Sequence, residues 1–398
     1  MRVQPRPSES TPTAGFRPAP GGPAAGVYVH VPFCSAICPY CDFAVTRGDA
    51  AARGRYVDLL LQEISGWQLD GVEVDTLYLG GGTPSALAPE QLARLVEALR
   101  ARFSCGPDLW ITLEANPEDV DRERVEAWHR LGVRMLSLGV QALDDEALRF
   151  LGRRHRRQQA LRAVETGLAA GFPVVSIDLI YAWPHQEAEA WRGHLREAVA
   201  LGIQHLSCYE LTVHDGTPLA RLFARRPALL VGEERRGELF RATHRELADA
   251  GWDGYEVSNF ARTPAARSKH NQKYWRHAPY LGLGPSAHSF DGRARWWNER
   301  ELAMWARAIE ERGSSVAGSE QLDAAKLRLE ALMLGLRTTE GVDLERLRRD
   351  LAWDLLAIHG DLVATFEQSG LVMVRGHRLA PTVEGMAVAD GLALRLSE

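Results

Sequence analysis

Cysteine is scarce in this sequence, and the few cysteines present are unevenly placed. There are five in 398 residues, and three of them, Cys34, Cys38 and Cys41, lie close together. An odd, clustered set does not suit a framework of structural disulfides and favours metal chemistry in a reducing compartment. We therefore expect a metal-binding protein of the cytoplasm.

Long apolar runs and a strong excess of positive charge are also lacking. No apolar run approaches the ~20 residues that a membrane-spanning helix needs, which leaves only peripheral contact with a membrane. The formal net charge is −5, which argues against general nucleic-acid binding. Residues 1–24 are rich in Pro, Gly, Ala, Ser and Thr and have no apolar core typical of a signal peptide. We predict that they form a disordered tail.

The three clustered cysteines follow a short predicted strand. Val27, Val29 and Val31 alternate with other residues as in a buried strand, and Pro32 ends it. The spacing C-x3-C-x2-C then offers three soft thiolates, which suit an iron–sulfur cluster or zinc. Three cysteines on a cubane cluster would leave one iron open to a small molecule. The alternative is a structural zinc site with His30 or a distant residue as its fourth ligand.

Strand and helix patterns alternate six times after this point. An α/β fold with a parallel sheet and outer helices follows from that alternation, and the length favours an open partial barrel. Glu114, Gln141 and Asp178 stand where predicted strands end, and ligands in parallel folds bind at those ends. We predict strands near 27–31, Asp75–Leu79, Trp110–Leu113, Arg134–Leu138, Val174–Leu179 and His205–Tyr209.

The cysteine motif resembles that of the radical SAM superfamily, in which an aromatic residue, here Tyr40, precedes the last cysteine. The resemblance implies a partial (β/α)6 barrel and a [4Fe–4S] cluster held by Cys34, Cys38 and Cys41. It also implies that S-adenosylmethionine (SAM) chelates the open iron and can be cleaved to a deoxyadenosyl radical if an electron donor is available.

Further motifs resemble the anaerobic coproporphyrinogen III oxidase-like branch of that superfamily. They include Gly80–Ser85, Glu114-x-Asn116-Pro117 and Ser176–Tyr181. One stretch departs from the branch, because Ala182-Trp183-Pro184-His185 stands where Gly-Leu-Pro-Gly is usual, and this puts the loop conformation in question. The residues that the resemblance assigns to SAM are Tyr28, Gly81, Gly82, Thr83, Glu114, Gln141, Arg153 and Asp178.

Two features separate the chaperones of this branch from its enzymes. The dehydrogenases carry a fourth cysteine two residues after the third, where this sequence has Phe43. The stretch His270–Trp275 matches the H-N-Q-x-Y-W signature of the HemW-type heme chaperones, in which it is associated with heme. The resemblance thus implies a heme chaperone that transfers heme to an acceptor protein, with His270 as the candidate heme ligand. The alternative is an oxygen-independent coproporphyrinogen III dehydrogenase, whose turnover we do not expect here.

The last part of the chain has a different pattern. Two helical faces are followed by Leu371–Val374 and Arg378–Ala380 around a Gly-containing turn, which predicts a hairpin and a winged-helix-like domain. No basic recognition face stands out, so we expect no nucleic-acid partner. We interpret the segments Gly254–Phe260 and Gly282–Ser289 as loops lining the ligand cavity. The predicted division is a tail at 1–24, a radical SAM core at 25–255, a connecting segment with the HNQKYW motif at 256–318 and a helical, winged-helix-like domain at 319–398.

Overall fold

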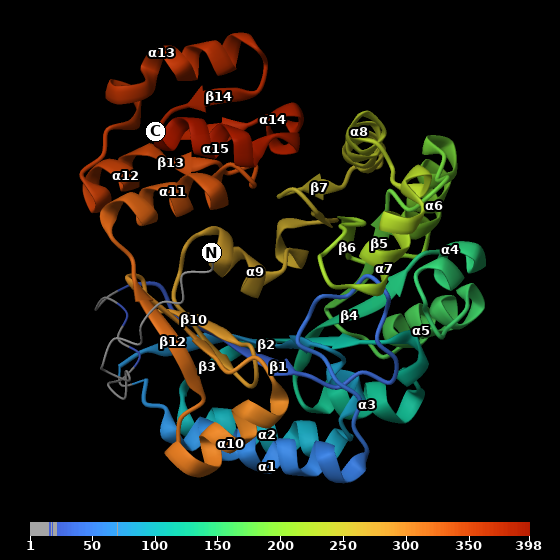
Figure 1. Ribbon diagram of the computed structural model, residues 1–398. Helices are drawn as coiled ribbons and strands as arrows, with labels where there is room; N and C mark the ends of the chain where they lie inside the picture. The colour runs from blue at the N-terminus through green and yellow to red at the C-terminus, as the bar shows by residue number, and fades with distance from the viewer. Residues whose placement is uncertain (1–15, 17, 19–21, 70) are drawn as a thin grey trace. The chain divides into compact units, whose positions relative to one another are not determined.

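The computed structural model describes residues 16, 18, 22–69 and 71–398 (Figure 1). The chain divides into two compact units. The first comprises Met1–Ser35, Ala44–Trp110 and Ala278–Leu322, and the second Ala36–Phe43, Ile111–His277 and Asp323–Glu398. The predicted tail at 1–24 lies almost wholly outside the described residues. Within it, the ring of Phe16 is buried and meets Trp296 edge-on, with 6.1 Å between ring centroids.

Six strands of the predicted alternation are present, each followed by one or more helices. Their apolar, β-branched sequences suit strands covered on both faces. The strands are β1 (Ala25–Val31), β2 (Glu73–Gly81), β3 (Ser104–Ala115), β4 (Val133–Gln141), β5 (Val174–Tyr181) and β6 (His205–Glu210). The helices are α1 (Ala50–Gly66), α2 (Pro89–Arg102), α3 (Arg122–Arg130), α4 (Asp145–Phe150), α5 (Arg157–Ala169), α6 (Ala188–Ala200), α7 (Pro218–Arg225) and α8 (Glu233–Asp249).

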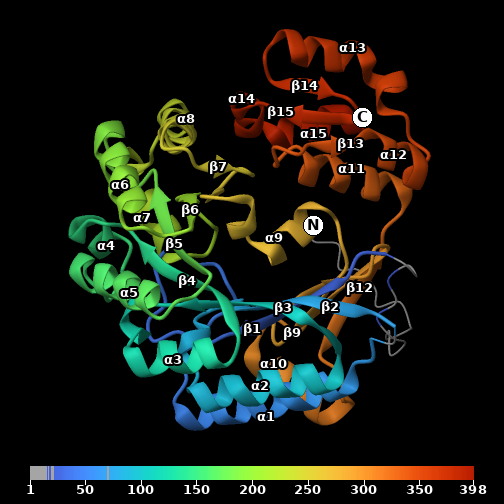
Figure 2. The ribbon, with the colours of Figure 1, turned by 180° about the vertical axis from the view of Figure 1, so that it is seen from behind.

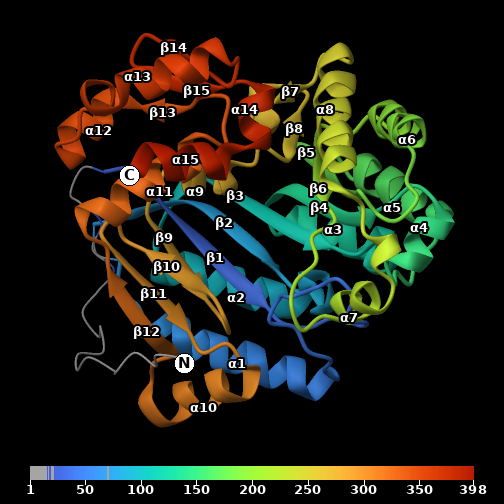
Figure 3. The same ribbon diagram turned by 45° about the horizontal axis from the view of Figure 1, so that its top comes forward.

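In the first unit the strand order is β12-β11-β10-β9-β1-β2-β3, with β1 parallel to both β2 and β9. Helices α1 and α2 lie side by side, and α10 lies next to α1 (Figures 2 and 3). The strands and helix that complete this unit are β9 (Tyr280–Leu283), β10 (His288–Phe290), β11 (Ala294–Asn298), α10 (Leu302–Arg312) and β12 (Val316–Gln321).

In the second unit the order is β3-β4-β5-β6-β8-β7, and the neighbours from the end of β3 to β6 are parallel. The predicted parallel α/β architecture is therefore confirmed. The segments that we interpreted as loops are partly strands, which corrects that interpretation. Short strands that contain glycine give too little alternation to be recognised. This part of the unit holds β7 (Asp253–Gly254), β8 (Asn259–Ala261) and α9 (Lys269–Trp275).

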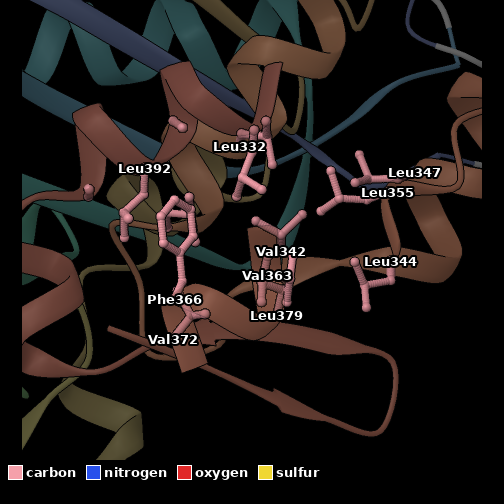
Figure 4. Close-up of a cluster of buried hydrophobic side chains, with 14 of the residues drawn as sticks. Leu332, Val342, Leu344, Leu347, Leu355, Val363, Phe366, Val372, Leu379 and Leu392 are labelled. Atoms are coloured by element: carbon pink, nitrogen blue, oxygen red, sulfur yellow. The ribbon is translucent and has the colours of Figure 1, made fainter. Parts of the chain in front are cut away.

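The C-terminal part of the second unit has its own core (Figure 4). Its small sheet has the order β13-β15-β14, and the predicted hairpin is confirmed, with Gly376 in the left-handed region at the turn. Its elements are α11 (Ala324–Gly335), β13 (Val342–Asp343), α12 (Leu344–Leu351), α13 (Leu355–Gln368), β14 (Val372–Arg375), β15 (Arg378–Pro381), α14 (Val383–Ala387) and α15 (Ala389–Ser397).

No helix in the described part of the chain combines the length and the apolar character needed to cross a bilayer.

Candidate functional site

Three of the predicted site residues, Gly82, Thr83 and Cys34, are brought together in the first unit, at the carboxyl ends of β1 and β2. The amide of Gly82 donates to the carbonyl of Val31 at 2.8 Å, and the Thr83 hydroxyl donates to Cys34 Sγ at 3.5 Å. A Cβ on Gly82 would lie 2.9 Å from the Val31 and Phe33 carbonyl oxygens. Glycine is thus required for the loop after β2 to approach the cysteine segment this closely.

Tyr28 and His30 form a hydrogen-bonded pair on β1. The Tyr28 hydroxyl lies 3.0 Å from His30 Nδ1, and His30 Nε2 lies 2.9 Å from the carbonyl oxygen of Ala44. Because a carbonyl only accepts, Nε2 carries the proton and Nδ1 accepts from the tyrosine. Burial lowers the pKa of His30, so the ring is neutral. Both ring nitrogens are engaged, which argues against His30 as the fourth ligand of a zinc site.

The other two cysteines belong to the second unit, where Arg153 reaches Cys38. Arg153 Nη1 donates to Cys38 Sγ at 3.4 Å, while Nη2 donates to Asn116 Oδ1 at 2.5 Å and to the Gly139 carbonyl at 2.9 Å. Asn116 follows β3 and Gly139 lies in β4. One guanidinium therefore links the ends of two strands to a predicted cluster ligand. We did not predict Asn116 as a site residue, although its Glu-x-Asn-Pro motif was the available signal.

The polar residues predicted at the ends of the third, fourth and fifth strands also lie in the second unit, although β5 continues to Tyr181 and so places Asp178 inside the strand. Asp178 accepts from the Ser137 hydroxyl at 3.4 Å, and burial raises the pKa of its carboxyl group to about 6. Gln141 ends β4 in the left-handed region, with φ of 68°. A Cβ at Gly139 would lie 3.0 Å from Gln141 Nε2 and 3.5 Å from Arg153 Nη2. Glu114 is half-buried near the end of β3.

The donor chemistry of the three clustered cysteines fits an iron–sulfur cluster. None of the three is in a disulfide, all three are partly exposed, and two of their sulfurs accept hydrogen bonds from side chains outside the loop. Within the described ranges, no three His, Cys, Asp or Glu side chains are gathered closely enough to hold a metal ion, and Cys34 falls in a different unit from Cys38 and Cys41. Their assignment as cluster ligands stays a prediction.

His270 lies on α9 and is fully buried. Its Nε2 is 2.8 Å from the Tyr274 hydroxyl, one helical turn further along. Burial, with a smaller effect from Lys273, lowers the pKa of His270 to about 3, so the imidazole is neutral, as an iron ligand must be. In this conformation Tyr274 engages Nε2, one of the two ring nitrogens through which an imidazole can bind iron.

Comparison with known proteins identifies the relatives of this chain. The model of the radical SAM superfamily matches residues 28–198, and that of the HemN C-terminal domain matches residues 322–388. The heme chaperone HemW of Mycobacterium tuberculosis H37Rv is 35% identical over 391 residues, which is 96% of this chain and 97% of that protein. HemW of Escherichia coli K12 is 37% identical over 67% of this chain and 70% of its own length.

A mitochondrial radical S-adenosyl methionine domain-containing protein 1 from Bos taurus is 33% identical over 95% of this chain and 88% of its own length. Among solved structures, coproporphyrinogen III oxidase (HemN) from Escherichia coli aligns with a TM-score of 0.81 over 96% of this chain and 92% of its own. Its sequence identity is 23%, so this likeness bears on the fold alone. The relatives that match along nearly the full length show that the chain belongs to the HemW heme chaperone family of radical SAM proteins.

Proposed function

We propose that this chain binds heme and passes it to an acceptor protein. The observation that carries the proposal is the 35% identity to a curated heme chaperone over nearly the whole of both chains. An alignment of that extent includes the C-terminal part and α9 as well as the barrel. The proposal therefore does not depend on the radical SAM motif, which many unrelated enzymes share.

We further propose that Cys34, Cys38 and Cys41 hold a [4Fe–4S] cluster and that SAM binds beside it. When bound, the cluster supplies single-electron chemistry toward SAM. In the first unit, the Thr83 hydroxyl donates to Cys34 Sγ, and the Gly82 amide just before it donates to the Val31 carbonyl, while Gly81 stays a predicted SAM contact. In the second, Arg153 and Asp178 offer a cation and a carboxylate suited to a carboxylate and a ribose hydroxyl. Tyr28, Glu114 and Gln141 stay predicted SAM contacts. Three clustered cysteines outside any disulfide also support a cytoplasmic location.

Phe43 supports the chaperone over the dehydrogenase. Its side chain is 64% exposed in the second unit and stands where the dehydrogenases have their fourth cysteine. A phenyl ring can neither ligate iron nor transfer a proton. It offers instead an apolar surface of the kind that a porphyrin face can contact.

The candidate heme ligand His270 requires a local rearrangement. Its ring is buried, and its Nε2 is engaged by Tyr274. Heme coordination through this nitrogen must therefore break that hydrogen bond and expose the ring, for example by unwinding the short α9. We propose that α9 opens when heme binds.

Heme titration of the reconstituted chain, followed by its Soret absorbance, tests the function. We expect stoichiometric uptake, transfer to apomyoglobin as a generic acceptor, and no conversion of coproporphyrinogen III in the presence of SAM and a reductant. H270A should weaken heme uptake at least tenfold, while H377A, a change at an exposed hairpin turn, should not. Absence of heme uptake would refute the chaperone function, and turnover of coproporphyrinogen III would establish the dehydrogenase instead.

A further inference from the structure

Two of the three predicted cluster cysteines receive a hydrogen bond from a side chain outside the cysteine loop. In the first unit, the Thr83 hydroxyl donates to Cys34 Sγ at 3.5 Å. In the second, Arg153 Nη1 donates to Cys38 Sγ at 3.4 Å. Sulfur is a large acceptor, and these separations fall within the usual range for hydrogen bonds to it. The donors are thus aimed at the atoms that would bind iron.

The guanidinium of Arg153 is held in a fixed orientation. Its Nη2 donates both to Asn116 Oδ1 and to the Gly139 carbonyl, so the fork cannot turn away from Cys38 without losing two hydrogen bonds. Arg153 Nε is buried and has no hydrogen-bond partner, which adds to the cost of this arrangement. We expect a cation that is held in place at this cost to act electrostatically on the sulfur of Cys38, to which it donates. A lysine carries its donors on a single nitrogen and lacks the planar fork, so it could not reproduce this geometry, in which two nitrogens reach the three acceptors.

We propose that Arg153 and Thr83 tune the reduction potential of the cluster through the sulfurs of Cys38 and Cys34. Hydrogen bonds to the ligand sulfurs and nearby charge are among the factors that set the potential of an iron–sulfur centre. Both donors withdraw negative charge from the thiolates and favour the reduced, more anionic cluster, so they raise its potential. The cation at Cys38 has the larger effect, and the neutral hydroxyl at Cys34 has the smaller one. The inference rests on the proposed cluster and does not require heme binding.

This role is separate from the predicted contact of Arg153 with SAM. A contact with SAM would act only when SAM is present, whereas a hydrogen bond to Cys38 acts on the cluster alone. The distinction can be measured, because the cluster can be titrated without SAM.

The test is a redox titration of the reconstituted full chain without SAM and without heme, with the reduced cluster followed by EPR. In R153Q, the ratio of oxidised to reduced cluster at a fixed applied potential should rise at least tenfold, which is 59 mV for one electron. R153K should fall between R153Q and wild type, because it keeps the charge and loses the fork. T83V should raise the ratio about threefold, and T83S, which restores the hydroxyl, should match wild type. R154Q removes an exposed neighbouring arginine and should leave the ratio unchanged.

Wild-type potentials in both R153Q and T83V would overturn the inference. If R153Q assembles no cluster, the comparison of the cluster potentials of T83V and T83S tests the inference instead, and equal potentials in these two variants would overturn it. If the variants show the predicted shifts in potential and the wild-type chain takes up no heme, the proposed chaperone function is contradicted and this inference stands. A wild-type chain with no iron–sulfur signal after reconstitution would contradict the cluster, and this inference with it.

Discussion

Ala182 and His185 occupy positions where side chains are costly. Both have left-handed backbones, with φ of 61° and 64°, and both lie in the stretch Ala182-Trp183-Pro184-His185 that departs from the pattern of the branch. The loop keeps its conformation in the absence of glycine, because the Ala182 amide donates to Gln186 Oε1 at 2.7 Å and the loop is held between β5 and α6. A side chain in this region costs roughly 1–2 kcal/mol.

We predict that H185G stabilises the protein by about 0.5–1 kcal/mol. The side chain of His185 is exposed, so its removal loses no buried contact, and the relief of strain outweighs the entropy that glycine adds to the unfolded chain. Urea unfolding measures the change. The matched control is H377G, which alters another exposed histidine without positive φ and should destabilise by a similar amount. Equal losses in both variants would show that the loop at His185 is not strained.

At the scale of elements, Glu63 joins helix α1 to four later segments of the first unit. Its carboxylate accepts from the Gly284 amide at 2.8 Å and from Trp305 Nε1 at 3.3 Å. It also accepts from Asn298 Nδ2 at 2.8 Å and from the Ser315 hydroxyl. Burial raises the pKa of Glu63 to about 7 in spite of these four donors.

The raised pKa of Glu63 predicts that the stability of the fold depends on pH. The folded state holds a proton on Glu63 up to about pH 7, while the unfolded chain releases it near its ordinary pKa of 4.5. The contribution of this proton to the free energy of unfolding is therefore fully present below pH 4.5 and is lost as the pH rises through 7. Relative to E63Q, the free energy of unfolding of the wild type should fall by roughly 3 kcal/mol between pH 5 and 8. A difference between the two proteins that does not change with pH would contradict a raised pKa.

The parallel strands could be predicted because β1 to β6 alternate with amphipathic helices and end in distinctive polar residues. The strands β9 to β12, which pair with one another in antiparallel fashion, could not, since each is short and several contain glycine or charged residues. Asp178 and Arg153 were recognisable from local motifs. The link from Arg153 to Asn116 and Cys38 was not, because it joins residues far apart in sequence, and only folding of the sheet brings them together.

At the scale of the whole molecule, the C-terminal part has an independent core. The buried residues of that core all come from 332–396. Its connections to the rest of the second unit include the ion pair of Arg267 with Glu340 at 3.4 Å and the hydrogen bond between His277 Nε2 and Glu330 at 2.9 Å. Partly exposed ion pairs stabilise weakly compared with a buried core. The predicted boundary between 318 and 319 falls inside β12 and stays a prediction.

We therefore predict that the C-terminal part can unfold locally while the barrel strands stay folded. Leu379 lies in β15 and is fully buried in this core, so L379A should cost about 2–5 kcal/mol. L394A makes the same change at an exposed position of α15 and should cost under ~0.5 kcal/mol. Native-state hydrogen exchange should show faster exchange in L379A for peptides within 324–397 and unchanged exchange for β4 and β5. Equal acceleration in both regions would mean that the second unit unfolds as one cooperative body, and the separate core would then not be an independent folding unit.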